Sequence, residues 1–192
     1  EDLGQFDDQR EIFWATGACM FVRSKAFWEV GGFDGDYFAH MEEIDLCWRF
    51  KNIGYKIYVE PKSFVYHVGG GTLNKLSSRK TFLNFRNNLT TLTKNHPSGF
   101  LFFKIIWRMK LDGIAAFKFL LDGQPSHFFA VIRAHFAYYG WLPKTLAKRK
   151  KAKQHPKFKF SMRKAYDGNI VLEHFIRKKK SFSELSQSAF LD

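Results

Sequence analysis

The chain has 192 residues, of which 45% are hydrophobic and 26% are charged. This length and composition predict one domain, or one domain with an extension, and exclude collagen-like, disordered and disulfide-scaffold classes. Aromatic residues reach 18%, with 23 Phe among them, and the net charge is +13. The charge is uneven, because residues 1–72 hold 7 Lys and Arg against 12 Asp and Glu, whereas residues 73–192 hold 24 against 6. An acidic first part and a basic, aromatic second part indicate two different roles.

Cys19 and Cys47 are the only cysteines in the sequence. They cannot form a disulfide framework and make no Cys-x-x-Cys pair for zinc, so we expect two reduced thiols in a cytosolic protein. The chain does not begin with Met and carries no signal peptide, and we expect it to be a fragment of a longer protein. It has no apolar run long enough to predict a membrane-spanning helix.

Strand and helix signals alternate over the first seventy residues. Strands are expected at Ile12–Val22, Tyr55–Val59 and Ser63–Val68, because these runs are apolar and aromatic and are bounded by turn residues. Helices are expected at Ser24–Val30, which Gly31-Gly32 ends, and at Glu42–Asn52. The second helix begins with carboxylates, which suit the positive end of a helix dipole.

After Thr72 the sequence becomes helical, aromatic and basic. Helices are expected at 76–94, 100–122 and 127–142, followed by an exposed basic stretch at 144–159 and by weak helical signals in the last thirty residues. In the helix at 100–122 most charged residues fall within an arc of about 120°, and the rest of its circumference is apolar. No internal repeat is present.

Five short motifs follow one another over 57 residues of the first part. They are Thr16-Gly17-Ala18, Gly31-Gly32-Phe33-Asp34, Glu42-Glu43-Ile44-Asp45-Leu46 with Trp48-Arg49, Gly54-Tyr55, and Val65-Tyr66-His67 with its glycines. In this order they resemble the second half of the catalytic domain of family-2, GT-A-type glycosyltransferases, which are inverting enzymes that use nucleotide sugars. The basic remainder resembles, less specifically, the membrane-associated extension that often follows such domains.

The resemblance implies an α/β fold and three regions. Residues 1–72 would be the acceptor and base half of the catalytic domain, without its nucleotide-binding half. Residues 73–150 would be an amphipathic helical extension, and residues 151–192 a basic tail. The isolated chain is then expected to be inactive, because the donor side of the site would be missing.

Inverting transfer is a single displacement, in which a base removes the proton of the acceptor hydroxyl as its oxygen attacks the sugar. The family pattern carries a Glu-Asp pair whose second member is this base, and here the pair is Glu42-Glu43. The resemblance therefore assigns the base to Glu43, with Glu42 and Asp45 orienting the acceptor or the neighbouring backbone. The alternative is that these acidic residues only complement the helix dipole.

Four further assignments follow from the resemblance. His67 would join a Mg²⁺ or Mn²⁺ ion, with carboxylate and diphosphate oxygens as the other ligands. The backbone around Gly70, Gly71 and Thr72 would approach the phosphates of the donor, and Arg49 would either reach that diphosphate or pair with the acidic cluster. Trp14 and Gly17 would contact the acceptor. The structural alternatives are a satisfied histidine, a glycine hinge and a core tryptophan.

Asp34-Gly35-Asp36 spells the Asp-x-Asp of a metal site but follows two glycines. Asp is a common turn residue, so a turn rather than a metal motif is expected there.

The expected function is transfer of a sugar from a nucleotide-sugar donor to a glycan or lipid-linked acceptor. The resemblance implies a bacterial enzyme at the cytoplasmic face of the membrane, where aromatic residues and Lys or Arg would meet anionic lipid. One alternative is a non-catalytic basic module that binds membrane or nucleic acid, although no nucleic-acid-binding signature is present. Another is a structural or dimerising helical domain.

Overall fold

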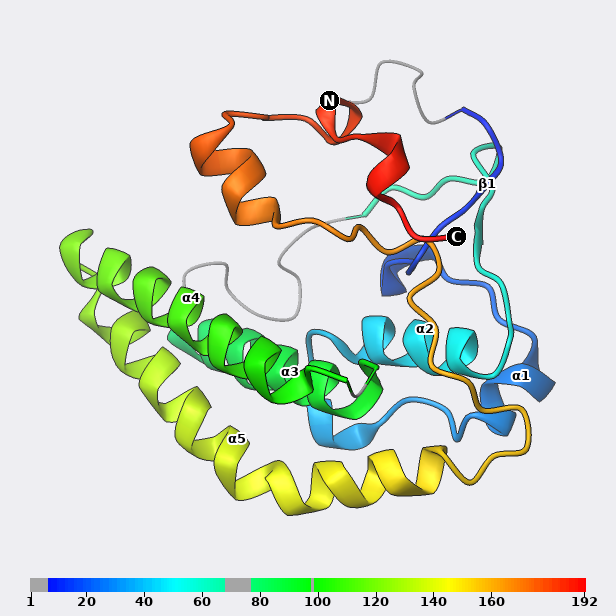
Figure 1. The fold of residues 1–192 in the computed structure, drawn as a ribbon, viewed down its shortest axis with the longest axis horizontal. Helices are drawn as coiled ribbons and strands as arrows, with labels where there is room; N and C mark the ends of the chain where they lie inside the picture. Colours follow the sequence, from blue (N-terminus) through cyan, green and yellow to red (C-terminus); the bar gives the residue numbers. More distant parts are fainter. Residues whose placement is uncertain (1–6, 68–76, 98) are drawn as a thin grey trace.

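The computed structural model describes residues 7–67, 77–97 and 99–192, which are mostly helical (Figure 1). The first part contains β1 (Arg10–Glu11), α1 (Ser24–Glu29), α2 (Glu42–Asn52) and β2 (Tyr58–Val59). The second contains α3 (Ser78–Asn95), α4 (Leu101–Leu121) and α5 (Pro125–Ala152). Short 3₁₀ turns lie at Gly17–Cys19, Gly35–Tyr37, Phe182–Glu184 and Gln187–Ala189, and a π-helical turn lies at Leu172–Ile176.

The sheet is much smaller than the sequence predicts. β1 and β2 pair in antiparallel fashion, with Arg10 opposite Val59. The expected strand at Ile12–Val22 is wrong, because among the described residues only Ile12 extends this ladder, through one bond to the carbonyl of Ile57. Residues 63–67 form no strand either. An apolar run becomes a strand only beside a partner strand, so the expected α/β sheet is not present in the described part of the chain.

The predicted helices are confirmed, except at the end of the last one. α2 has the predicted bounds, and Gly54 follows it with φ +92°. α5 runs through Pro143 to Ala152, so the basic stretch expected from residue 144 begins inside this helix. Its residues Lys144, Lys150 and Lys151 are exposed, as predicted. Thr145 and Arg149 are buried there, because the Arg149 guanidinium donates to the carbonyls of Thr93 and Lys94 at the end of α3.

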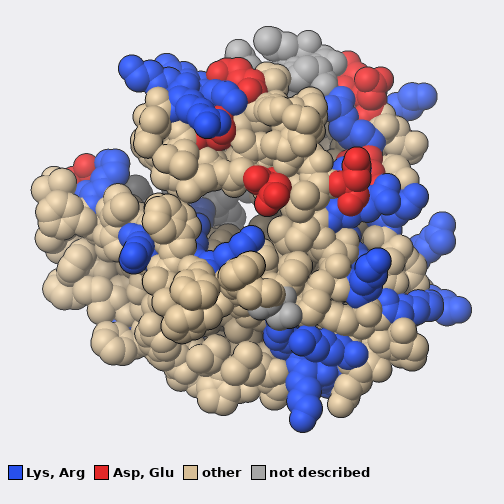
Figure 2. Space-filling model, viewed as in Figure 1, with Lys and Arg blue, Asp and Glu red and all other residues tan. Residues whose placement is uncertain are grey.

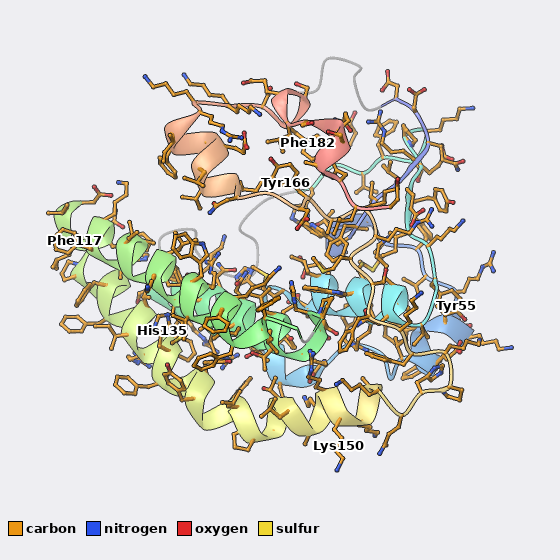
Figure 3. All side chains as sticks on the ribbon, viewed as in Figure 1. Tyr55, Phe117, His135, Lys150, Tyr166 and Phe182 are labelled. Carbon is orange, nitrogen blue, oxygen red and sulfur yellow. The ribbon has the colours of Figure 1, made fainter. Side chains whose placement is uncertain are left out.

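α3, α4 and α5 pack on one another as a three-helix layer (Figure 1). Their shared apolar core is Leu89, Ile105 and Tyr138, one residue from each helix. A polar contact also joins α4 to α5, since His135 Nε2 lies 3.2 Å from the buried carboxylate of Asp112; His135 is labelled on α5 in Figure 3.

A second small core lies in the first part, around Ala26, Leu46 and Phe50. The chain after α5 passes over α2, as Figure 1 shows. It is held there by Asn52, whose Oδ1 accepts from the N–H of Ser161, and by the indole of Trp48, which donates to the Ser161 carbonyl. Both the three-helix layer and the C-terminal segment therefore pack against α2.

α4 leaves a wide apolar face uncovered by the described residues. Figure 2 shows a largely uncharged surface over α4 and the first part of α5, with isolated Lys and Arg, whereas Lys and Arg gather over the end of α5. None of the described helices is long and apolar enough to cross a membrane. The exposed residues of this face are Phe102, Phe103, Ile106, Trp107, Ile114, Phe117, Leu120 and Leu121.

Candidate active site

The acidic start of α2 lies against the Thr16-Gly17-Ala18 segment. A Cβ atom added to Gly17 would lie 4.0 Å from the Cβ of Glu43, an ordinary contact distance, so the two residues are neighbours. The N–H of Ala15 also approaches the Sγ of Cys47, one turn further along α2, at 3.5 Å. Two motifs that are 26 residues apart in sequence therefore meet at the start of α2.

Glu43 has the environment of a group that can accept a proton. Its side chain is half-buried, and one carboxylate oxygen, Oε2, has no hydrogen-bond partner among the described residues, which is also true of Oε2 of Glu42. Burial raises the pKa of the Glu43 carboxyl above its ordinary value, and the neighbouring charge of Glu42 raises it further. A buried oxygen without a donor is costly to the fold, and an acceptor hydroxyl would supply the missing hydrogen bond.

Asp45 occupies a different environment from Glu43. It is fully buried, and its carboxylate accepts hydrogen bonds from Arg49 (2.8 Å), Lys94 (2.9 Å) and Asn95 (2.7 Å), and from the hydroxyl of Tyr37. Burial raises the pKa of Asp45, but Lys94 and Arg49 outweigh burial, so the net shift is downward. Asp45 therefore organises protein groups and does not present a carboxylate to a substrate.

Arg49 is held inside the protein. Its guanidinium donates to Asp45 and to the carbonyls of Val30 (2.6 Å) and Gly32 (2.7 Å). The side chain thus ties α2 to the Gly31-Gly32 turn after α1. Of the two roles expected for Arg49, the structure shows the ion pair with the acidic cluster. The three nitrogen atoms that donate these hydrogen bonds are not available to a diphosphate.

The loop before α2 is strained and is held by α3. Phe38, His40 and Met41 all have positive φ, between 63° and 71°, a conformation that residues with a side chain rarely adopt. The amide of Asn87 donates to the carbonyls of Tyr37, Ala39 and His40, at 3.1, 2.9 and 2.8 Å. Asn87 is fully buried and was missed by sequence reasoning, because nothing in a helical sequence marks an amide that faces a distant loop.

Two of the remaining residues assigned from the sequence, Trp14 and His67, are exposed. Trp14 is 42% exposed on the segment before Gly17, so its ring is open to solvent. His67 is exposed, and the residues that follow it, including Gly70, Gly71 and Thr72, lie outside the described residues.

The Asp34-Gly35-Asp36 segment is a 3₁₀ turn, as predicted. The carboxylates of Asp34 and Asp36 are paired with lysines: Lys94 and Lys148 contact Asp34, and Lys144 and Lys148 contact Asp36. Burial raises the pKa of Asp34, but Lys94 and Lys148 outweigh burial and hold this pKa well below its usual range. In the described part of the chain, no group of three or more His, Cys, Asp or Glu side chains is arranged to hold a metal ion.

The known proteins that match parts of this chain are glycosyltransferases. The chain is 38% identical over 65 residues to N-acetylglucosaminyl-diphospho-decaprenol L-rhamnosyltransferase of Mycobacterium tuberculosis, which covers 33% of this chain and 21% of that protein. It is 39% identical over 56 residues to the rhamnosyltransferase WbbL of Escherichia coli, covering 29% and 21% of the two chains. It is 31% identical over 100 residues to the pre-mycofactocin glycosyltransferase of M. tuberculosis, covering 50% and 21%.

These similarities support a glycosyltransferase relationship for the chain. Each alignment spans about a fifth of the relative's length, so the relatives contain much that this chain does not match. No protein-family model matches the chain, and no solved structure matches it.

Proposed function

We propose that this chain supplies the acceptor and base side of an inverting glycosyltransferase of family 2, GT-A type, with Glu43 as the general base. The observation that carries the proposal is the Glu43 carboxylate itself. It is half-buried at the start of α2, has one oxygen without a partner among the described residues, and has a raised pKa. A base of raised pKa takes a proton more readily in the transition state than an ordinary carboxylate does.

In this proposal the surrounding groups position Glu43. Gly17 lies beside the side chain, and Asn87 holds the loop that leads into α2. Asp45 and Arg49 hold α2 against the turn after α1. Trp14, exposed on the segment before Gly17, is the ring that we assign to stacking on the acceptor sugar.

The donor in this proposal is a nucleotide sugar, and the acceptor is a glycan or a lipid-linked glycan. Transfer of this kind uses Mg²⁺ or Mn²⁺ to neutralise the departing diphosphate. Among the described residues His67 is the one that we assign to the metal, and by itself it does not make a metal site. The other ligands would come from the donor and from carboxylates outside this chain.

We also propose that α4 lies on the cytoplasmic surface of the membrane. Its exposed face carries eight large apolar side chains, and Lys104 and Lys110 are exposed on the same helix. Aromatic and basic residues together favour the headgroup region of an anionic bilayer. Nothing among the described residues covers this face, which favours membrane binding over the alternative that it packs within the protein.

The test of the base is Glu43→Gln in the full-length protein, compared with Glu42→Gln. Loss of a general base typically lowers the rate by about 10²–10⁴, so Glu43→Gln should lose transfer to that extent while the matched Glu42→Gln loses less. The measurement is release of nucleotide from a nucleotide sugar in the presence of acceptor. Transfer by Glu43→Gln at the parent rate would rule out Glu43 as the base, and a larger loss in Glu42→Gln would move the role to that residue.

A further inference from the structure

A cavity of about 480 Å³ lies between the loop before α2, the start of α3 and the middle of α5. Three arginines line it, Arg79 and Arg86 from α3 and Arg133 from α5. Three aromatic side chains, Phe38, Phe82 and Trp141, line it with them. We call this cavity the arginine pocket.

Each guanidinium in the arginine pocket lies near an aromatic ring. Arg79 Cζ is 4.8 Å from the ring centroid of Phe38, Arg86 Cζ is 3.9 Å from that of Trp141, and Arg133 Cζ is 5.6 Å from that of Phe82. Such contacts fix a planar guanidinium by its face and leave N–H groups at its edge for an acceptor.

The three arginines form no salt bridge with a carboxylate in the described part of the chain. Arg86, which is buried, donates instead to the carbonyls of Asp36 and Tyr37 and to the side-chain oxygen of Asn87. Arg79 and Arg133 are exposed on their helices. The carboxylate of Asp36 also lines the cavity, but Lys144 and Lys148 pair with it. The pocket therefore carries an excess of positive charge.

The start of α3 adds to this potential. Ser78 and Arg79 belong both to the first turn of this 18-residue helix and to the wall of the pocket. No acidic residue lies in that turn, and no side chain among the described residues caps it. The first N–H groups of a helix have no partner within the helix, and the positive end of its dipole favours an anion.

Exposed aromatic residues continue from the pocket along α5. Phe129 and Phe136 lie four residues before and three residues after Arg133, so all three share one face of the helix. Phe129 is 59% exposed and Phe136 is 73% exposed. A charged pocket that opens onto an apolar helix face suits a ligand with a phosphate head and a hydrocarbon chain.

We propose that the arginine pocket binds the diphosphate of a lipid-linked acceptor, with the lipid lying along Phe129 and Phe136. The assignment deepens the function proposed above and rests on it for the acceptor role. A diphosphate carries two groups of oxygens, and each can accept hydrogen bonds from a guanidinium group. A diphosphate therefore matches three arginines better than a single carboxylate would. Phe38 lines the pocket and belongs to the loop that leads into α2, where Glu43 lies five residues further along, so the pocket and the proposed base are joined by one short segment.

The first experiment measures binding of inorganic pyrophosphate to the 192-residue chain by titration calorimetry. Each variant removes charge-assisted hydrogen bonds to the ligand, so Arg79→Gln and Arg133→Gln should each weaken binding by roughly tenfold or more. Both side chains are exposed, and the variants should therefore fold as the parent does. Arg23→Gln, an exposed arginine before α1, is the matched control and should bind as the parent does. An equal loss of pyrophosphate binding in all three variants would overturn the proposal that the arginine pocket binds diphosphate. So would unchanged binding in both Arg79→Gln and Arg133→Gln.

The second experiment separates the two sources of such a phosphate group. Vesicles of a neutral lipid that contain a polyprenyl diphosphate are compared with vesicles of the same neutral lipid that contain enough phosphatidylglycerol to give the same surface charge. Arg79→Gln should lower binding to the first and leave binding to the second unchanged, and pyrophosphate should compete only with the first. The same loss on both vesicles would overturn the diphosphate assignment in favour of general attraction to anionic headgroups.

Glu43→Gln distinguishes failure of the pocket from failure of the base. This variant should bind pyrophosphate as the parent does, whether or not Glu43 is catalytic. In the full-length protein, Arg79→Gln should raise the KM for a diphosphate-linked acceptor and leave that for the nucleotide sugar unchanged. A raised KM for the nucleotide sugar alone would assign the pocket to the donor and overturn the proposal.

Discussion

The ammonium of Lys94 lies 2.9 Å from the carboxylate of Asp45, and neither side chain reaches solvent to any large extent. This contact joins the end of α3 to the first turn of α2, and so joins the basic helical part of the chain to the acidic first part. Asn95 adds a second hydrogen bond to the same carboxylate. The two parts that charge separates in the sequence are thus joined by a buried polar network, with Asp45 at its centre.

Asp45→Asn should be strongly destabilising. The amide keeps the shape of the side chain but leaves Arg49 without its carboxylate partner and Lys94 with that of Asp34 alone, and breaking a buried ion pair costs about 3–5 kcal/mol. Urea unfolding of the chain measures the loss. Because the pKa of Asp45 is lowered in the folded protein, its contribution is present above the ordinary carboxyl pKa and is lost as pH falls through the folded value.

The control for Asp45→Asn is Asp122→Asn, which breaks the exposed pair of Lys118 and Asp122 on α4. Exposed pairs contribute about 0–1 kcal/mol, so this variant should unfold close to the parent. Similar stability of the two variants would mean that the buried network does not hold α2 to α3.

Glu43→Gln should leave the folded chain at least as stable as the parent at neutral pH. The pKa of Glu43 is raised by burial, so the folded carboxyl holds its proton to higher pH than the unfolded one. Stability is therefore lost as pH rises from the unfolded pKa through the folded pKa, and the uncharged amide avoids that loss. Thermal unfolding at pH 4 and pH 7 tests this, because parent and variant should converge at the lower pH. The exposed Glu60→Gln is the control, and a destabilised Glu43→Gln at neutral pH would indicate a structural role.

Asn87→Ala should make the loop before α2 more mobile. The carbonyls of Ala39 and His40 would lose this donor, whereas that of Tyr37 would keep Arg86, and a buried unsatisfied group costs about 1–3 kcal/mol. The strained conformations of Phe38, His40 and Met41 would then relax, and hydrogen exchange of the amides at 37–41 should speed up more than exchange in the rest of the chain. Asn84→Ala, one turn earlier on α3 and only half-buried, is the control. Unchanged exchange in this loop would show that its conformation does not depend on Asn87.

Trp107→Ser should weaken binding of the chain to vesicles. Trp107 is 53% exposed on the apolar face of α4, and removing it takes away apolar area that binding would bury. Trp28→Ser is the matched control, because Trp28 is 72% exposed on α1, away from this face. Vesicle sedimentation at two salt concentrations is the measurement. For the parent, binding to anionic vesicles should weaken as salt rises but not vanish, since only the charged contribution is screened.

The vesicle assay also addresses the alternative roles of the basic helices. A DNA competitor should not displace the chain from vesicles, whereas nucleic-acid binding would fall steeply with salt and show no vesicle preference. If the parent does not sediment with anionic vesicles even at low salt, the membrane proposal is wrong and a partner protein or a second copy would have to cover α4.

Local pattern was enough to predict α2, because its carboxylates at the start, its periodic apolar residues and Gly54 after its end are all near one another in sequence. For the same reason the helices at 78–95 and 101–121 lie close to their predicted bounds. The resemblance that pointed to glycosyltransferases also depends on short motifs, and the comparisons with known proteins support that class. The resemblance assigned the base to Glu43 and an orienting role to Asp45, but no local pattern showed which groups contact the two carboxylates.

Only the tertiary structure shows that the contacts of Asp45 and Glu43 differ. Asp45 faces α3, where Lys94 and Asn95 surround it, whereas Glu43 faces Gly17 and keeps one oxygen without a partner among the described residues. Partners about 50 residues away in sequence decide this difference, and no local pattern contains them. The same holds for the strand expected at Ile12–Val22, since a strand requires a neighbouring strand, and for the arginine pocket, whose walls come from three separate elements. Helices follow from contacts within a few residues, while sheets, buried charges and pockets are set by residues that only the fold brings together.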